Sequence, residues 1–153
     1  MATGGQIARG FRNDGQLEAI LQYIKPGDLF LLKMGINDTA AKNATTDAEF
    51  KEIMRDMVRQ VAATGATPVL VTPQGRATDF VDGVHSSVNR WYRNSTVALA
   101  GEEHVPLVDL NVLASAFFTE IGPEATLALF MTGDTLHPNR AGAANWPAWC
   151  QKI

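Results

Sequence analysis

The sequence has little cysteine and no long apolar run, and each shortage excludes a class of protein. Its 153 residues include one cysteine, Cys150, which rules out an intrachain disulfide and any zinc motif built on cysteines. No stretch reaches the roughly 18 consecutive apolar residues that a membrane-spanning helix needs. Met1–Arg9 also lacks the apolar centre of a secretory signal. We therefore expect no membrane partner, and the compartment stays open.

Clusters of basic residues are absent as well. Thirteen Lys and Arg stand against sixteen Asp and Glu, for a formal net charge of −3. Without a basic patch the chain has nothing to follow a phosphate backbone, so we expect no nucleic-acid partner. Hydrophobic residues make up 46% of the sequence, enough for the core of one compact domain at this length. We expect a single domain over residues 1–153.

Three short apolar runs are typical of strands in a parallel sheet. They span Leu29–Met34, Thr67–Thr72 and His104–Asp109, and helical patterns separate them. Strands joined by crossover helices run parallel and wind into an α/β sandwich. We therefore expect a flavodoxin-like, three-layer α/β/α fold. In it, the first run is covered on both faces, and functional loops gather at the carboxyl ends of the strands.

Helices are predicted where apolar residues recur every three or four positions. The clearest follows a capping box made by Thr46 and Glu49 and ends before Gly65. The other predicted helices run from Asn13 to Ile24, from Val84 to Ala98, from Leu110 to Ile121, from Glu124 to Met131, and from Arg140 onward.

Two polar loops carry residues with chemical potential. Gly35-Ile36-Asn37-Asp38 follows the first predicted strand, where the Asn37 amide would project into the crevice above the sheet. In Asp134-Thr135-Leu136-His137, a carboxylate three residues from an imidazole can hold Nδ1 and leave Nε2 free as a base. Each motif alone is more often a turn or a helix cap. His85 and His104 share no ligand spacing with His137, so we expect no metal site.

Taken together, these two loops and three further short stretches of the sequence resemble the SGNH-hydrolase superfamily, and within it the rhamnogalacturonan acetylesterase-like carbohydrate esterases. The resemblance covers almost the whole chain. It implies serine-type removal of acetyl groups from an oligosaccharide or polysaccharide, with no cofactor. It also implies roles for four residues: the Gly5 backbone N–H and the Asn37 side chain as oxyanion donors, His137 as general base, and Asp134 as its partner. The matching blocks are residues 2–9, the Lys-Pro-Gly-Asp turn at 25–28, Gly35–Asp38, Asp134–His137, and the small-residue helix start at Arg140–Ala143.

The sequence departs from this resemblance at the nucleophile. SGNH hydrolases take their serine from a Gly-Asp-Ser block on the first strand, and no Gly-Asp-Ser occurs in this sequence. The resemblance thus implies a chain truncated at its N-terminus, without the first strand, the first helix and most of the second strand. Its serines fall in or beside predicted helices, so none is assigned as nucleophile; they are Ser86, Ser87, Ser95 and Ser115.

Two functions stay open at this point, besides a fragment without function. One is an acetylesterase whose serine comes from outside this chain. The other is a catalytically inactive carbohydrate-binding or interaction module that keeps the crevice and has lost the nucleophile.

The implied truncation has a physical consequence for the strand Leu29–Met34. In a flavodoxin-like order this strand pairs with the first strand, so the truncated sheet has an apolar edge with unpaired backbone groups. We expect that a second copy of the chain pairs through this edge, giving a homo-oligomer, or that Met1–Phe11 folds over it.

Overall fold

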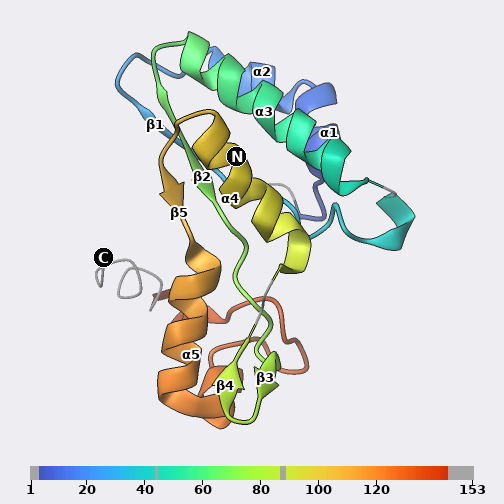
Figure 1. Ribbon diagram of the computed structural model, residues 1–153, viewed down its shortest axis with the longest axis vertical. Helices are drawn as coiled ribbons and strands as arrows, with labels where there is room; N and C mark the ends of the chain where they lie inside the picture. Colours follow the sequence, from blue (N-terminus) through green and yellow to red (C-terminus); the bar gives the residue numbers. More distant parts are fainter. Residues whose placement is uncertain (1–3, 44, 87–88, 145–153) are drawn as a thin grey trace. The chain divides into compact units, whose positions relative to one another are not determined.

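The computed structural model describes residues 4–43, 45–86 and 89–144. Its internal contacts divide the chain into two compact units. The sheet unit comprises residues 1–73 and 91–108, and the hairpin unit comprises residues 74–90 and 109–153 (Figure 1). The single domain expected over residues 1–153 stays a prediction.

The sheet unit is built on three parallel strands. They are β1 (Leu29–Leu32), β2 (Thr67–Val71) and β5 (Leu107–Val108), in the order β1-β2-β5. Leu29 lies opposite Thr67 in the first pair, and Leu70 lies opposite Leu107 in the second. The predicted α/β class with a parallel sheet is therefore confirmed, although β1 and β5 are shorter than the apolar runs that predicted them.

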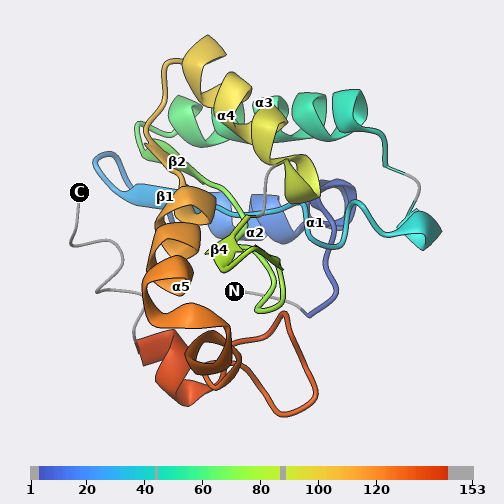
Figure 2. The same ribbon diagram turned by 60° about the horizontal axis from the view of Figure 1, so that its bottom comes forward.

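Helices α3 (Asp47–Ala63) and α4 (Arg93–Glu102) lie side by side over the sheet (Figures 1 and 2). As predicted, α3 begins with a cap, because the Thr46 hydroxyl accepts the Glu49 N–H at 3.2 Å. The shorter α1 (Ala8–Asn13) and α2 (Gln16–Leu21) precede β1, and α1 packs on α3. The described residues also include two 3-10 turns, at Ala41–Asn43 and at Arg90–Tyr92.

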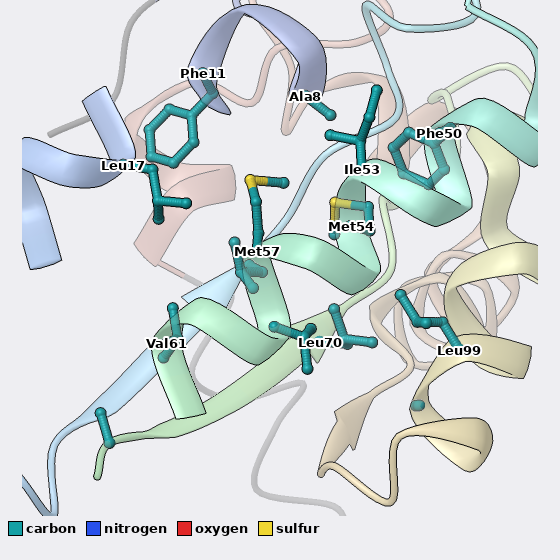
Figure 3. Close-up of a cluster of buried hydrophobic side chains, with 14 residues drawn as sticks. Ala8, Phe11, Leu17, Phe50, Ile53, Met54, Met57, Val61, Leu70 and Leu99 are labelled. Atoms are coloured by element: carbon teal, nitrogen blue, oxygen red, sulfur yellow. The ribbon is translucent and has the colours of Figure 1, made fainter. Parts of the chain in front are cut away.

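The core of the sheet unit lies along the apolar stripe of α3 (Figure 3). That stripe is the one the sequence predicts, and it meets side chains from α1, α2, β2 and α4. The labelled members are Ala8, Phe11 and Leu17 on the first two helices, Phe50, Ile53, Met54, Met57 and Val61 on α3, Leu70 on β2 and Leu99 on α4.

Within the described residues of the sheet unit, only one face of β1 is buried, which corrects the expectation of cover on both faces. Successive side chains alternate between the faces of a strand. Leu32 is buried and Phe30 is half-buried, whereas Leu29 and Leu31 are 68% and 62% exposed. The nearly unbroken apolar run therefore reflects one face in the core and one apolar face open.

The helix predicted from Asn13 is also corrected. Asn13 ends α1, which the sequence analysis missed, and the next helix starts at Gln16 after Gly15 in the left-handed conformation. No side chain of its own caps either helix. At the start of α1, the Ala8 N–H instead donates to the carboxylate of Asp38, thirty residues further along the chain. No local sequence pattern reveals this contact.

The hairpin unit contains a two-stranded hairpin that replaces part of a predicted helix. β3 (Phe80–Val81) and β4 (Val84–His85) pair antiparallel, so the helix expected from Val84 begins only at Arg93. Their two-residue loop is Asp82-Gly83, with both residues at positive φ. Asp-Gly between apolar residues is a strong hairpin signal, and it was present in the sequence.

A long helix, α5 (Leu110–Leu127), anchors this hairpin. Gly122 breaks it at φ 81° before Pro123, between the two predicted helices. The second of these ends at Leu127 and not at Met131, because Phe130 forms an antiparallel bridge with Pro138. His85 is buried against α5: its Nδ1 lies 3.0 Å from the Ser115 Oγ and its Nε2 lies 2.8 Å from the Arg76 carbonyl oxygen. A last helix begins at Arg140 as predicted. Proline interrupts a helix, so the sequence predicts a bend or break of this one at Pro147, which lies outside the described residues.

None of the helices in residues 4–43, 45–86 and 89–144 combines the length and apolar character needed to cross a bilayer.

Gly35→Ala is expected to destabilise the sheet unit by about 3 kcal/mol or more. Gly35 has φ 118°, and a Cβ there would lie 2.2 Å from the Trp91 carbonyl oxygen. That oxygen belongs to the backbone, so it cannot move aside as the end of a flexible side chain could. Urea unfolding measures the loss. Gly101→Ala is the matched control, because Gly101 is helical with open space around it. Equal stability of the two variants would contradict this packing.

Candidate active site

The buried carboxylate of Asp38 organises the loop that follows β1. Asp38 is 1% exposed; its Oδ2 accepts the Gly35 N–H at 3.1 Å and its Oδ1 accepts the Ala8 N–H at 2.9 Å. Burial raises the pKa of this carboxyl, while the backbone N–H groups of Ala8 and Gly35 act in the opposite direction. One side chain therefore joins the start of α1 to the loop at the end of β1.

A second bond between the same segments places Asn37 beside the Gly5 turn. The Asn37 Nδ2 donates to the Gln6 carbonyl oxygen at 3.1 Å, and the Asn43 Nδ2 in turn donates to the Asn37 carbonyl oxygen at 2.5 Å. Gly5, next to Gln6, is exposed at φ 74°. An amide nitrogen carries two hydrogens, so Asn37 keeps one beyond its bond to Gln6. The structure brings together the two residues expected to donate to an oxyanion.

Asp134 and His137 form the hydrogen bond that their spacing predicts. The His137 Nδ1 lies 2.6 Å from Asp134 Oδ2, while Asp134 Oδ1 accepts the N–H groups of Leu136 at 2.7 Å and His137 at 3.1 Å. The Leu136 N–H and the His137 ring lower the pKa of Asp134 to about 2, so its carboxylate is charged at neutral pH. The His137 side chain is 72% exposed. Among the described residues, no bond to its Nε2 is found.

Residues that the sequence analysis overlooked hold this loop in place. The Gln74 Nε2 donates to the Leu136 carbonyl oxygen at 3.3 Å, and the Ala77 N–H donates to the Thr135 carbonyl oxygen at 2.8 Å. On the other side, the Asn139 Nδ2 donates to the carbonyl oxygens of Ala128 and Phe130. Gln74 comes shortly after the second predicted strand, and functional polar residues of α/β proteins gather at the carboxyl ends of strands. Its position in the sequence could therefore have identified it as a candidate site residue.

The four predicted site residues fall into two pairs. Gly5 and Asn37 belong to the sheet unit, and Asp134 and His137 belong to the hairpin unit. Each pair is assembled within its own unit. That both pairs act on one ester carbonyl stays a prediction.

Ser115 and His85 form a further serine–histidine contact. The His85 ring lies between Phe80 and Phe118, with centroid separations of 5.0 and 4.9 Å, and its Nε2 faces a backbone carbonyl oxygen. This buried arrangement fixes the hairpin to α5, and we assign no nucleophile there. In the part of the chain that the structure describes, no group of three or more metal-ligating side chains is found.

An apolar groove of about 570 Å³ runs from Asn37 along β1. Its walls include Phe30 and Met34 from the β1 segment and Phe11 and Ile20 from α1 and α2. Lys33 also lines it, and burial lowers the pKa of this amine to about 8. The groove is thus mostly hydrophobic with one basic group.

The parallel sheet, the asparagine loop after β1 and the Asp–His pair are features that the SGNH resemblance implies. The chain belongs to the GDSL-like lipase/acylhydrolase family, whose model matches residues 2–144. The SGNH resemblance drawn from the motifs is thereby confirmed.

Individual relatives agree with this assignment. The chain is 72% identical over 144 residues to the uncharacterized esterase YxiM of Bacillus subtilis, covering 94% of this chain. It is 31% identical over 140 residues to the probable rhamnogalacturonan acetylesterase YesY of the same organism, covering 89% of this chain. It spans 38% and 64% of their respective lengths.

Solved structures give the same fold. The crystal structure of YxiM superposes with a TM-score of 0.94 at 68% identity, over 97% of this chain and 42% of that one. An acetylxylan esterase from Geobacillus stearothermophilus superposes with a TM-score of 0.71 at 19% identity, over 97% of this chain and 67% of that one. The second likeness concerns the fold alone.

Asp38→Asn is expected to lower the free energy of unfolding by about 1–3 kcal/mol at neutral pH. An amide has one oxygen, so one of the N–H groups of Ala8 and Gly35 would face an NH₂ donor instead of an acceptor. Thermal or urea unfolding measures the change. Asp14→Asn makes the same chemical change at an exposed position of this unit and should be nearly neutral. A similar effect of both variants would argue against the Asp38 bridge.

Lys33→Met is expected to stabilise the chain at pH 7 by on the order of 1–3 kcal/mol. Because the folded pKa of about 8 lies below the ordinary 10.5, the unfolded chain binds this proton more tightly between those values. Wild-type stability therefore gains from rising pH across that window, and the advantage of the variant shrinks there.

Unfolding at several pH values from 7 to about 10.5 tests the Lys33 prediction. Lys25→Met is the control, because Lys25 is exposed in the turn before β1. A stability difference between Lys33→Met and wild type that does not vary with pH would contradict the lowered pKa.

Proposed function

We propose that this chain supplies the oxyanion donors and the general base of a serine-type acetylesterase acting on an acetylated oligosaccharide or polysaccharide. The serine comes from a polypeptide segment outside this chain. The observation that carries the proposal is the 2.6 Å bond from Asp134 to the His137 Nδ1, with the ring exposed. A carboxylate in that position selects the tautomer whose Nε2 can accept a proton.

The proposed chemistry uses each residue for one task. His137 takes the proton of the serine hydroxyl as the serine attacks the acetyl carbonyl, and returns a proton to the departing sugar oxygen. Asp134, charged because its pKa is about 2, stabilises the imidazolium in between. The Gly5 N–H and the Asn37 amide stabilise the oxyanion, at about 2.7–4 kcal/mol for a well-placed donor. Both donors are neutral and have no acidic proton with which to quench the negative oxygen.

The substrate class rests on the names of relatives. YesY, 31% identical to this chain, is named a probable rhamnogalacturonan acetylesterase, and YxiM is named an esterase. These names support an acetylated carbohydrate as the substrate here. An inactive carbohydrate-binding or interaction module is the second candidate, and the lack of Gly-Asp-Ser in this sequence favours it.

Hydrolysis of p-nitrophenyl acetate tests the catalytic proposal. We compare this chain with a chimera in which it replaces the matched region of full-length YxiM. The chain alone should give a weak rate at best, and the chimera a clear one. Within the chimera, Asn37→Ala should lower kcat by about 10²–10³-fold, the usual loss for one oxyanion donor.

His137→Ala in the chimera should reduce turnover to the rate of the chain alone. The control is Asn13→Ala, because Asn13 is exposed at the end of α1. If the chain, the chimera and the His137→Ala variant all hydrolyse the ester at the same background rate, the esterase proposal fails and the inactive module is favoured.

A further inference from the structure

His85 is a buried histidine that lies outside the Asp134–His137 pair. It belongs to β4, which packs on α5 (Figure 1). Its backbone N–H donates to the Thr119 hydroxyl oxygen at 2.9 Å, and its Nδ1 lies 3.0 Å from the Ser115 Oγ. Both its backbone and its ring are therefore fixed to α5, and this leaves the direction of Nε2 defined as well.

The Nε2 of His85 faces the peptide group between Arg76 and Ala77, here called the first peptide group. It lies 2.8 Å from the Arg76 carbonyl oxygen, and because a carbonyl oxygen only accepts, Nε2 carries a hydrogen and donates it. A trans peptide group directs its C=O and its N–H to opposite sides. The N–H of this one, on Ala77, donates to the Thr135 carbonyl oxygen at 2.8 Å. One peptide group thus joins His85 to the loop that carries His137.

The series of hydrogen bonds continues through a second peptide group, between Thr135 and Leu136. Its carbonyl oxygen is the one that accepts from Ala77, and its N–H, on Leu136, donates to Asp134 Oδ1 at 2.7 Å. Asp134 Oδ2 in turn lies 2.6 Å from the His137 Nδ1. Two peptide groups in series therefore connect the ring of one histidine to the carboxylate that binds the other. All of these residues belong to the hairpin unit.

Every bond in this series points the same way, from the donor on His85 toward the carboxylate of Asp134. Hydrogen bonds aligned in series polarise one another, and here the negative charge lies at the accepting end, where it benefits. The Leu136 N–H is the strongest of the influences that lower the pKa of Asp134 to about 2. The donor on His85 thus supports the bond that contributes most to keeping Asp134 charged.

Two longer bonds also attach this loop, but they lie outside the series. The Gln74 Nε2 donates to the Leu136 carbonyl oxygen at 3.3 Å. The Arg76 Nη1 donates to the Thr135 hydroxyl oxygen at 3.4 Å. Neither bond is made to the C=O or the N–H of the second peptide group. They should keep the loop attached when His85 is replaced, so the effect on the carboxylate can be measured in a folded protein.

We propose that His85 is a positioning residue for the Asp134–His137 pair and that it acts through the two peptide groups. Its Nε2–H orients the first peptide group, the first orients the second, and the second holds the carboxylate against the His137 ring. That His137 then acts as a base rests on the proposed function, whereas the connection from His85 to Asp134 does not.

Nuclear magnetic resonance of the isotope-labelled chain tests the connection. His85→Leu removes the donor and keeps an apolar side chain, whereas in His85→Gln the side-chain amide can donate to the same carbonyl oxygen. In His85→Leu the amide protons of Ala77 and Leu136 should shift upfield, because their hydrogen bonds weaken. The Asp134 carboxyl should then titrate at a higher pH than in the wild type, since its charged form loses support. His85→Gln should return both readings toward the wild type.

Ser115→Ala is the matched control. It removes the contact to Nδ1 of the same ring and leaves the hydrogen on Nε2 in place. In urea unfolding it should lose stability, as His85→Leu does, but the Leu136 amide proton and the Asp134 titration should stay at their wild-type values. A general loosening of the hairpin would change both readings in both variants.

The unmodified chain provides a second test, which holds even if His85→Leu fails to fold. The nitrogen chemical shifts of the His85 ring show which nitrogen is protonated, and Nε2 should carry the hydrogen. An unprotonated Nε2 overturns the proposal, because the series then has no donor at its start.

Kinetics of the YxiM chimera separate this proposal from the proposed function. There His85→Leu should lower kcat by up to about 10²-fold with little change in KM, since a misplaced base affects the chemical step more than binding. His85→Gln should keep most of the activity. Shifts at Leu136 and Asp134 with an unchanged kcat support the connection and count against the proposed function. Unchanged resonances in His85→Leu, or equal changes in Ser115→Ala, overturn the proposal.

Discussion

The bridge made by Asp38 is the constraint on which the sheet unit's half of the site depends. A carboxylate that is 1% exposed is costly to bury, and here two backbone N–H groups from separate segments offset part of that cost. One of these groups starts α1 and the other belongs to Gly35, whose positive φ lets the chain turn directly after β1. The bond from Asn37 to Gln6 is a second tie between the same two segments. The two expected oxyanion donors are thus held by a structural carboxylate.

The pair in the hairpin unit is organised on a different principle. Asp134 and His137 are close in sequence, and the bonds between them are local and largely exposed. Rigidity comes from the surroundings, where Gln74 and Asn139 bind the backbone on either side. The N–H bonds of Leu136 and His137 keep this exposed carboxylate ionised, which suits a residue that orients a base.

The sequence was most informative where the deciding contacts are local. The capping box of α3, its apolar stripe and the Asp134–His137 bond all join residues a few positions apart, and all were predicted correctly. The α1 helix was missed because its start depends on a contact with the distant Asp38. The hairpin was missed because the apolar spacing over Val84–Ala98 was interpreted as a helix, although the Asp82-Gly83 turn indicates a hairpin. The bonds of His85 to Ser115 and Arg76 likewise join distant segments, so a histidine that looked isolated is a buried structural residue.

The carboxyl ends of the strands decide where the polar loops of the sheet unit lie. In a parallel sheet each strand delivers the loop at its carboxyl end. β1 delivers Asn37, β2 delivers the segment that begins at Gln74, and the next position outward, beside Leu29 and Leu31, has no strand among the described residues. Asn37 therefore lies at the carboxyl edge of the sheet because its loop directly follows β1, and its bond to the Gln6 carbonyl oxygen holds the segment before α1 at the same edge.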